Sequence, residues 1–194
     1  MKLKRLFDYD EYKGTKGYLK SQSKYEIART CLYFAISLSL FMAGIVATGD
    51  KMNLLTIVAV LGCLPACKSA VTMIMYLRYK GCLAEDMAKL SALPAELTQL
   101  WDLVFTTYDK NFAFSHASIQ GNTVILYSNN NALDEQACLK HLQNAMVLDG
   151  ITNITFKVFT DLDKYMLRAK DIIRLESDAE LTAAVAKTLL SISL

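Results

Sequence analysis

The sequence predicts an α+β protein in which an N-terminal two-helix transmembrane hairpin precedes a small cytoplasmic α+β domain. The hairpin is predicted by two apolar runs. No charged residue occurs between Arg29 and Asp50, and only Lys68 interrupts the stretch between Lys51 and Arg78. Each run is close to, or longer than, the roughly 20 residues that cross a bilayer as a helix. The domain is predicted by the helix and strand patterns that follow, in a segment long enough for one small core.

Composition divides the chain into a polar basic arm at residues 1–29, the transmembrane hairpin at 30–79 and the cytoplasmic α+β domain at 80–194. Residues 1–30 contain eight Lys or Arg against four Asp or Glu, whereas residues 81–194 contain nine against fourteen. A basic arm beside a membrane helix attracts anionic headgroups, so membrane lipid is a predicted partner. The acidic domain argues against nucleic acid as a partner.

Within the arm, Leu3, Leu6 and Phe7 favour a short amphipathic helix on the membrane surface, with a flexible arm as the alternative. Gly14 and Gly17 are expected to end any longer helix.

The charges that flank the apolar runs predict the orientation. Both outer flanks are rich in Lys and Arg, while the turn at residues 49–53 has one Lys and one Asp. Short loops rich in Lys and Arg remain cytoplasmic. The prediction is a multi-pass protein of the cell membrane with both termini in the cytoplasm. Five cysteines without framework spacing are expected to be small buried hydrophobes in a reducing compartment.

Two helices and a β-hairpin are predicted next. Residues 82–92 have a helical pattern, and Pro94 suits the first turn of a second helix through about residue 108. Strands at 112–119 and 123–128 flank a Gln-Gly-Asn turn. The second helix is predicted from one apolar face, made by Leu97, Leu100, Trp101, Val104 and Phe105.

Capping residues mark the remaining elements. Asp134 is expected to cap a helix that ends before Gly150, and Asp161 a helix to about residue 174. Between them, residues 154–160 have the β-branched and aromatic content of a strand. A last apolar helix begins at Ser177 or Asp178 and is expected to cover the three-stranded sheet, or else a second copy of the chain. The predicted order is α-α-β-β-α-β-α-α.

The segment from Gly62 to Ser69 resembles a P-loop, with Cys67 in place of the second glycine. A P-loop turns backbone N–H groups around phosphate, and the second glycine permits that turn. Pro65 also removes one donor. A membrane helix that contains a Pro and a Lys is therefore the favoured interpretation.

Lys68 is the one candidate functional residue within the predicted membrane helices. A charge in such a helix is costly and by default suggests function. The sequence leaves two interpretations open: a lysine that snorkels or packs between helices, and one that binds a partner helix, a lipid headgroup or a ligand.

No catalytic, cofactor-binding or metal-binding residue is predicted elsewhere. Cys138 and His141, with Asp134 one turn earlier, make half of a metal site at best. His116 is expected to be a packed or surface histidine in a strand. The β-β-α-β order resembles part of a restriction-endonuclease-like core, but the strands lack its acidic residue and its Glu-x-Lys.

The motif from Arg5 to Tyr12 (Arg-Leu-Phe-Asp-Tyr-Asp-Glu-Tyr) and the segment from Gly62 to Ser69 resemble those of uncharacterised bacterial membrane proteins. These proteins have a two-helix hairpin and a small cytoplasmic domain. The resemblance implies a bacterial cytoplasmic membrane and no particular activity.

The interpretation that fits these patterns is a non-enzymatic, membrane-anchored interaction module that binds a protein partner or forms a homo-oligomer. The first alternative is a membrane-anchored enzyme whose carboxylates and His116 converge only in three dimensions. The second is a small subunit of a transporter or channel assembly, with Lys68 lining the path.

Overall fold

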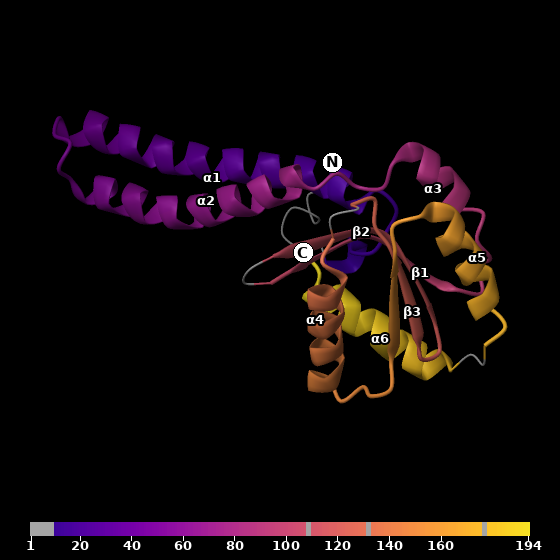
Figure 1. Ribbon diagram of the computed structural model, residues 1–194. Coiled ribbons are helices and arrows are strands. Elements are labelled where there is room, and N and C mark those ends of the chain that lie inside the picture. Colours follow the sequence, from indigo (N-terminus) through magenta and orange to yellow (C-terminus); the bar gives the residue numbers. More distant parts are fainter. Residues whose placement is uncertain (1–9, 108–109, 131–132, 176–177) are drawn as a thin grey trace. The chain divides into compact units, whose positions relative to one another are not determined.

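The computed structural model describes residues 10–107, 110–130, 133–175 and 178–194 and divides into two compact units (Figure 1). Of the described residues, the hairpin unit comprises residues 10–11 and Leu19–Lys80, and the α+β unit comprises Tyr12–Tyr18 and those from Gly81 onward. The predicted fold class, two long apolar helices ahead of a small mixed α+β domain, is confirmed. The amphipathic helix predicted at residues 3–7 lies outside the described residues.

The hairpin unit is built from α1 (Tyr18–Thr48) and α2 (Leu54–Arg78). α1 begins directly after Gly17, whose φ is +67°, so it extends well before the apolar run. Only 17% of the most apolar window of each helix is buried. Most of each window is therefore not covered by the rest of the described chain, and both helices are compatible with membrane insertion.

Small residues form the contact between the two helices. The hydroxyls of Thr30 and Ser69 are hydrogen-bonded at 2.8 Å and buried. A Cβ on Gly62 would lie 2.9 Å from the Ser37 hydroxyl, so a larger residue there would displace that hydroxyl. Small side chains that bring backbones together, and hydroxyls that bond across them, are typical of helix packing in membranes. On α2 the contact stripe has spacings of three and four residues: Ala59, Gly62, Ala66 and Ser69.

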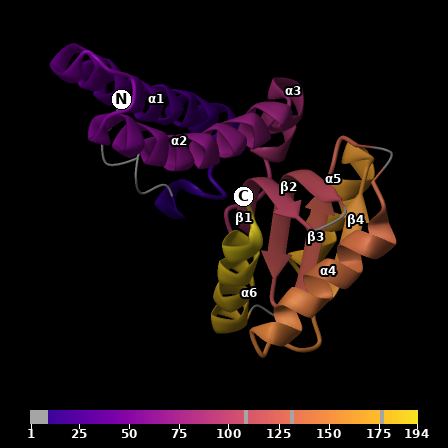
Figure 2. The ribbon, with the colours of Figure 1, turned by 90° about the vertical axis from the view of Figure 1, so that its left-hand side faces the viewer.

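The α+β unit contains one four-stranded sheet in the order β1-β2-β3-β4. Its first three strands are antiparallel neighbours, and β4 lies parallel to β3. α4 and α6 cover one face of the sheet, and α3 and α5 cover the other (Figures 1 and 2). The elements are β1 (Thr98–Thr106), β2 (Asn111–Gln120), β3 (Thr123–Tyr127), β4 (Thr155–Phe159), α3 (Ala84–Leu90), α4 (Glu135–Leu148), α5 (Leu162–Ile172) and α6 (Ala179–Ile192).

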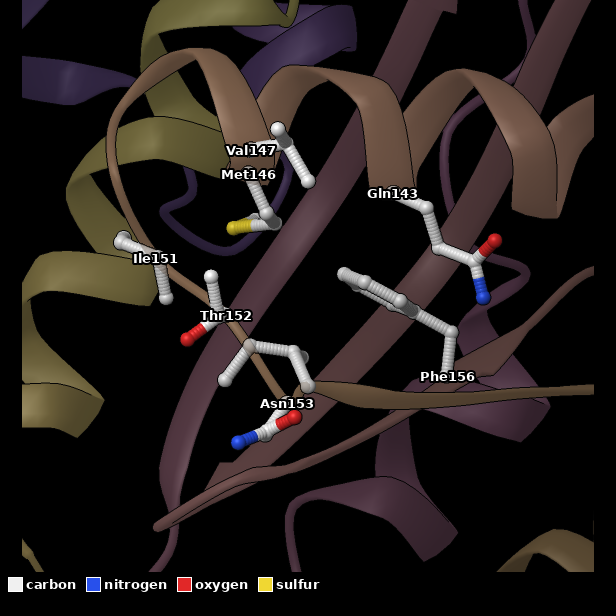
Figure 3. A pocket seen from close by; sticks show the side chains of 8 residues that line it. Gln143, Met146, Val147, Ile151, Thr152, Asn153 and Phe156 are labelled. Carbon is white, nitrogen blue, oxygen red and sulfur yellow. The ribbon is translucent and has the colours of Figure 1, made fainter.

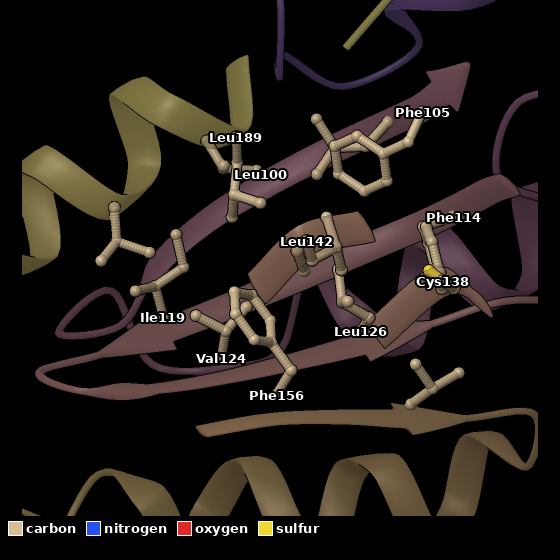
Figure 4. Packing of buried hydrophobic residues seen from close by; sticks show 14 of the residues in the cluster. Leu100, Phe105, Phe114, Ile119, Val124, Leu126, Cys138, Leu142, Phe156 and Leu189 are labelled. Carbon is tan, nitrogen blue, oxygen red and sulfur yellow. The ribbon is translucent and has the colours of Figure 1, made fainter. Parts of the chain in front are cut away.

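Each face of the sheet has its own apolar core. In the larger core, side chains of β1, β2 and β3 meet α4 and α6, and Leu142 and Leu189 are fully buried there (Figure 4). The smaller core packs Trp101 and Ile125 against Tyr165 of α5. The expectation that the last helix covers its own sheet is confirmed.

The helix predicted at residues 94–108 is wrong, because most of this segment forms β1. β1 is buried on both faces, so its apolar run is nearly continuous. Its alternation also shifts at Asp102, whose φ is +54°. Leu100 and Leu103, three residues apart, therefore belong to the same core. Spacings of three and four residues also mark a helix. The sheet thus has four strands, and the order is α-β-β-β-α-β-α-α.

Both ends of the α+β unit cover the outer edge of β1. The N–H of Trp101 donates to the carbonyl of Gly14 at 2.9 Å, and the N–H of Leu194 donates to the carbonyl of Val104 at 2.9 Å. The Lys13 ammonium donates to the carbonyl of Ser193 at 3.1 Å. Such cover protects an edge strand from pairing with other chains.

β4 forms the other edge of the sheet. At its two ends, the N–H of Thr155 donates to the carbonyl of Asn122 at 2.8 Å, and the carbonyl of Phe159 accepts from the N–H of Ser128 at 3.0 Å; Asn122 and Ser128 flank β3. In a parallel pair the intervening residues point the other way, so the backbone groups of Phe156 and Val158 face outward. Within the described residues, neither makes a backbone bond to another element. The two edges of the sheet therefore differ: one is covered and one is open.

Gly14 allows a test of the cover on β1. Its φ is +74°, and a Cβ there would lie 2.8 Å from Leu190 Cδ2 and 3.1 Å from Leu100 Cδ2. Gly17 has a φ of +67° and nothing within 4 Å of the same position. Gly14→Ala should lower the free energy of unfolding by about 1–3 kcal/mol more than Gly17→Ala, because only Gly14→Ala overpacks. Urea unfolding followed by the fluorescence of the single tryptophan, Trp101, measures this; equal losses would contradict the close packing.

Candidate functional site

Lys68 lies within one uninterrupted helix. α2 contains the whole segment from Gly62 to Ser69, together with Pro65. The amides that a P-loop would turn toward phosphate belong to a regular helix here, which confirms the helical interpretation of this segment.

The Lys68 side chain lies on the outer face of the hairpin and is exposed. Its neighbour Ser69 faces α1 and is 4% exposed. One turn away on either side, Leu64 and Val71 are 68% and 59% exposed. Within the described residues, no hydrogen bond or ion pair is formed by the Lys68 ammonium. The structure therefore separates Lys68 from the contact that joins α1 to α2.

A second candidate site is the pocket between α4 and the open edge of β4, whose lining is almost as polar as it is apolar. Its volume is about 270 Å³, and its polar lining is Gln143, Thr152 and Asn153 (Figure 3). Val147, at its rim, is 64% exposed, and the adjacent Leu148 is 87% exposed. The apolar side chains that line the pocket are Met146, Val147, Ile151, Ile154 and Phe156.

Two residues with positive φ shape the loop below this pocket. Gly150, with a φ of +74°, ends α4 where the sequence predicts. Asn153 has a φ of +63°, a conformation that asparagine tolerates better than most residues. The N–H of Ile151 returns to the carbonyl of Met146 at 2.8 Å. The loop therefore presents its side chains beside β4.

His116 is packed inside the α+β unit, as the favoured interpretation predicts. It is 0% exposed. Its Nδ1 is hydrogen-bonded to the Tyr165 hydroxyl at 2.6 Å, and that hydroxyl also bonds Ser118 Oγ at 2.8 Å. The Trp101 ring meets the imidazole edge to face, with centroids 4.3 Å apart. These contacts hold three elements together and leave His116 out of reach of a substrate.

The pKa of His116 is lowered from 6.5 to about 3, first by burial and then by the charge of Lys16. The Lys16 ammonium lies 5.0 Å from the centroid of the Trp101 ring. Burial also raises the pKa of the Tyr165 hydroxyl well above its ordinary value. His116 is therefore neutral at physiological pH.

Asp134, Cys138 and His141 do not form a metal site. Asp134 caps α4 by accepting from the Ala137 N–H at 3.1 Å, and it pairs with Lys110 at 2.7 Å. These two bonds lower the pKa of its carboxyl. Cys138 is fully buried in the larger core, and burial raises its pKa to about 12. Within the described residues, no three His, Cys, Asp or Glu side chains are grouped to hold a metal.

Sequence reasoning missed Asp102, a carboxylate only 2% exposed. One of its oxygens accepts the Cys82 N–H at 2.8 Å. Burial, with help from Asp102 and Asp86, raises the pKa of the Cys82 thiol to about 12, so Cys82 is not a thiolate. The available signal was a single charge within an apolar run, Leu-Trp-Asp-Leu-Val-Phe.

Comparisons of the chain with protein families, with curated proteins and with solved structures find no match. The assignment of function therefore depends on the geometry of this chain.

The buried His116 predicts an acid-sensitive stability. The pKa is 6.5 when the chain is unfolded and about 3 when it is folded. Between these values only the unfolded state binds the proton, so folding loses stability as the pH falls, by up to about 1.4 kcal/mol per pH unit. His116→Asn keeps a polar atom near Nδ1 but has no such proton. The free energy of unfolding, measured with urea across this pH range, should therefore fall less steeply with decreasing pH in the variant. An equal dependence on pH in both proteins would contradict the lowered pKa of His116.

Proposed function

We propose that this protein is a membrane-anchored interaction module. The hairpin unit spans the membrane, both termini lie in the cytoplasm, and the α+β unit binds another protein. One observation supports the binding role above all: the open edge of β4 lies beside a pocket of mixed polar and apolar lining and two exposed apolar residues, Val147 and Leu148.

The membrane role is supported by the surface of the hairpin. Its outer faces are apolar along both helices, with Leu38 63% and Val46 82% exposed on α1 and Leu54 77% exposed on α2. Water does not tolerate so large an apolar surface, whereas lipid does. The excess of Lys and Arg on the two outer flanks favours cytoplasmic termini.

The chemistry of the β4 edge favours a polypeptide partner. The outward N–H and carbonyl groups of Phe156 and Val158 have the spacing that another strand matches. A strand added there places alternate side chains toward α4, where the pocket accepts an apolar group. The amides of Gln143 and Asn153 are suited to bonding a peptide backbone. Lys157, exposed in the middle of β4, favours an acidic residue on the partner.

The docking role is tested with two matched variants. Val147→Ser with Leu148→Ser removes the apolar rim of the pocket. Leu167→Ser removes a side chain of similar exposure, 66%, from α5. After mild detergent extraction, mass spectrometry should detect at least one co-purifying protein whose recovery falls about tenfold with the double variant. A tenfold weaker affinity corresponds to about 1.4 kcal/mol of binding free energy. The same protein should remain with Leu167→Ser; identical profiles for all three chains would contradict docking at this surface.

The topology is tested by cysteine labelling in intact cells. A membrane-impermeant maleimide should modify Asp50→Cys in the turn between α1 and α2. It should not modify Ser21→Cys or Leu148→Cys until the membrane is permeabilised, because charged reagents do not cross the hydrocarbon core. The unsubstituted chain gives the background from its five cysteines. Labelling at residue 148 before permeabilisation would overturn the orientation.

A further inference from the structure

We infer that the open edge of β4 binds an extended segment of another protein as an antiparallel fifth strand, and that this segment has an acidic residue between two apolar residues. The inference deepens the proposed function and rests on the docking surface proposed there. The direction, the register and the side-chain chemistry of the partner strand follow from the residues of β4.

The outward backbone groups of β4 set the direction of the partner strand. Thr155 and Phe159 bond toward β3 at the two ends of β4, which leaves the backbone groups of Phe156 and Val158 on the outer side. In antiparallel pairing, the residues opposite Phe156 and Val158 each exchange two hydrogen bonds with β4, so a short segment satisfies both outward residues. A parallel strand spreads the same bonds over a longer segment and with a slanted geometry, so the short edge of β4 favours an antiparallel partner.

The two partner residues that bond to β4 place their side chains on the side of α4. Alternate residues of a strand lie on the same face, and Phe156 and Val158 pack in the larger core together with α4. A partner residue opposite Phe156 therefore reaches the pocket that Phe156 lines, whose volume is about 270 Å³ (Figure 3). Val147, on the rim of this pocket, is exposed. An apolar partner side chain removes that surface from water.

The middle residue of the partner segment lies on the other face of the sheet, directly opposite Lys157. Lys157 is exposed, and its ammonium lies 5.5 Å from the centroid of the Phe159 ring. Among the described residues, no carboxylate forms an ion pair with Lys157. The facing residues form a pair without hydrogen bonds, in which the Cα atoms approach to about 4.5 Å. Lys157 therefore attracts an Asp or Glu at this position and repels a Lys or Arg.

A second copy of this chain fits the same edge poorly. Two β4 strands that pair antiparallel through Phe156 and Val158 place Lys157 of one copy directly opposite Lys157 of the other. Like charges in directly opposite positions destabilise a strand pair. Charge complementarity therefore favours a different protein over a dimer formed through β4.

The test measures the binding of dye-labelled peptides to the full-length chain in a mild detergent, by fluorescence anisotropy. One peptide is Ser-Thr-Val-Glu-Val-Thr-Ser with blocked ends, and the matched peptide has Lys in place of Glu. The Glu peptide should bind at least about threefold more tightly, because Lys157 attracts one central residue and repels the other. Lys157→Glu should invert this preference, whereas Lys187→Glu, which changes an exposed lysine of α6, should leave it unchanged. Equal affinity for both peptides, or a preference that survives Lys157→Glu, would overturn the inference.

Methylation of single amide nitrogens tests whether the peptide binds as a strand in this register. Methyl groups on the two Val amides remove the donors to the carbonyls of Phe156 and Val158, so the affinity should fall at least about tenfold. A methyl group on the Glu amide, which points away from β4, should have little effect. A Val-methylated peptide that binds as well as the unmodified one, or a Glu-methylated peptide that loses as much affinity, would overturn the antiparallel strand.

The co-purification test of Val147→Ser with Leu148→Ser separates this inference from the docking role. If that double variant loses a partner protein but the Glu peptide does not bind at up to about 1 mM, the docking surface remains and only the strand addition is overturned. If no partner protein is lost and no peptide binds, both are overturned.

Discussion

Two adjacent residues of β1 hold both chain segments that connect the α+β unit to the hairpin unit. The N–H of Trp101 donates to Gly14, in the segment before α1, and the carboxylate of Asp102 accepts the Cys82 N–H, in the segment after α2. The left-handed conformation of Asp102, with a φ of +54°, costs about 1–2 kcal/mol. A charge-assisted bond to a backbone amide offsets a cost of that size. The α+β unit is thus completed by residues on both sides of the hairpin.

The same position organises the two cores. Because the alternation of β1 shifts at Asp102, Trp101 points toward α5, while Leu103 returns to the side of α4 and α6. Trp101 then contacts His116, whose bond to Tyr165 joins the sheet to α5. The other ring nitrogen of His116, Nε2, is buried without a hydrogen-bond partner, and an unmatched buried group costs about 1–3 kcal/mol. The bonds from Nδ1 to Tyr165 and from Tyr165 to Ser118 are therefore the polar contacts that fix this core. Tyr165 therefore connects α5 to the sheet through a specific geometry as well as through apolar packing.

Local chemistry made much of this fold predictable. Asp134, Asp161 and Asp178 cap the helices that follow them, because each side chain accepts a bond from the first turn. Local patterns gave the wrong prediction for β1. Because the side-chain alternation shifts at Asp102, Leu100 and Leu103 face the same core at a spacing of three residues, which is also typical of a helix. The sequence also did not predict that the edge of the sheet at β4 is open while the edge at β1 is covered. Gly14 and Leu194 cover β1 from distant parts of the chain, and such pairings leave no periodic pattern in the sequence. Lys68 was recognisable because a single charge in an apolar run needs no tertiary information.

Small residues, and not Lys68, hold the two helices of the hairpin together. Thr30, Ser37, Gly62 and Ser69 bring α1 and α2 together through hydroxyls and a glycine, and the Lys68 ammonium takes no part in that contact. The bond between Thr30 and Ser69 sets Lys68 level with the first residues of the apolar run of α1. The Glu26–Arg29 ion pair lies about one turn away from that level on α1. Under the proposed membrane anchor, the stem of Lys68 then needs to carry its ammonium only a short distance to the polar boundary.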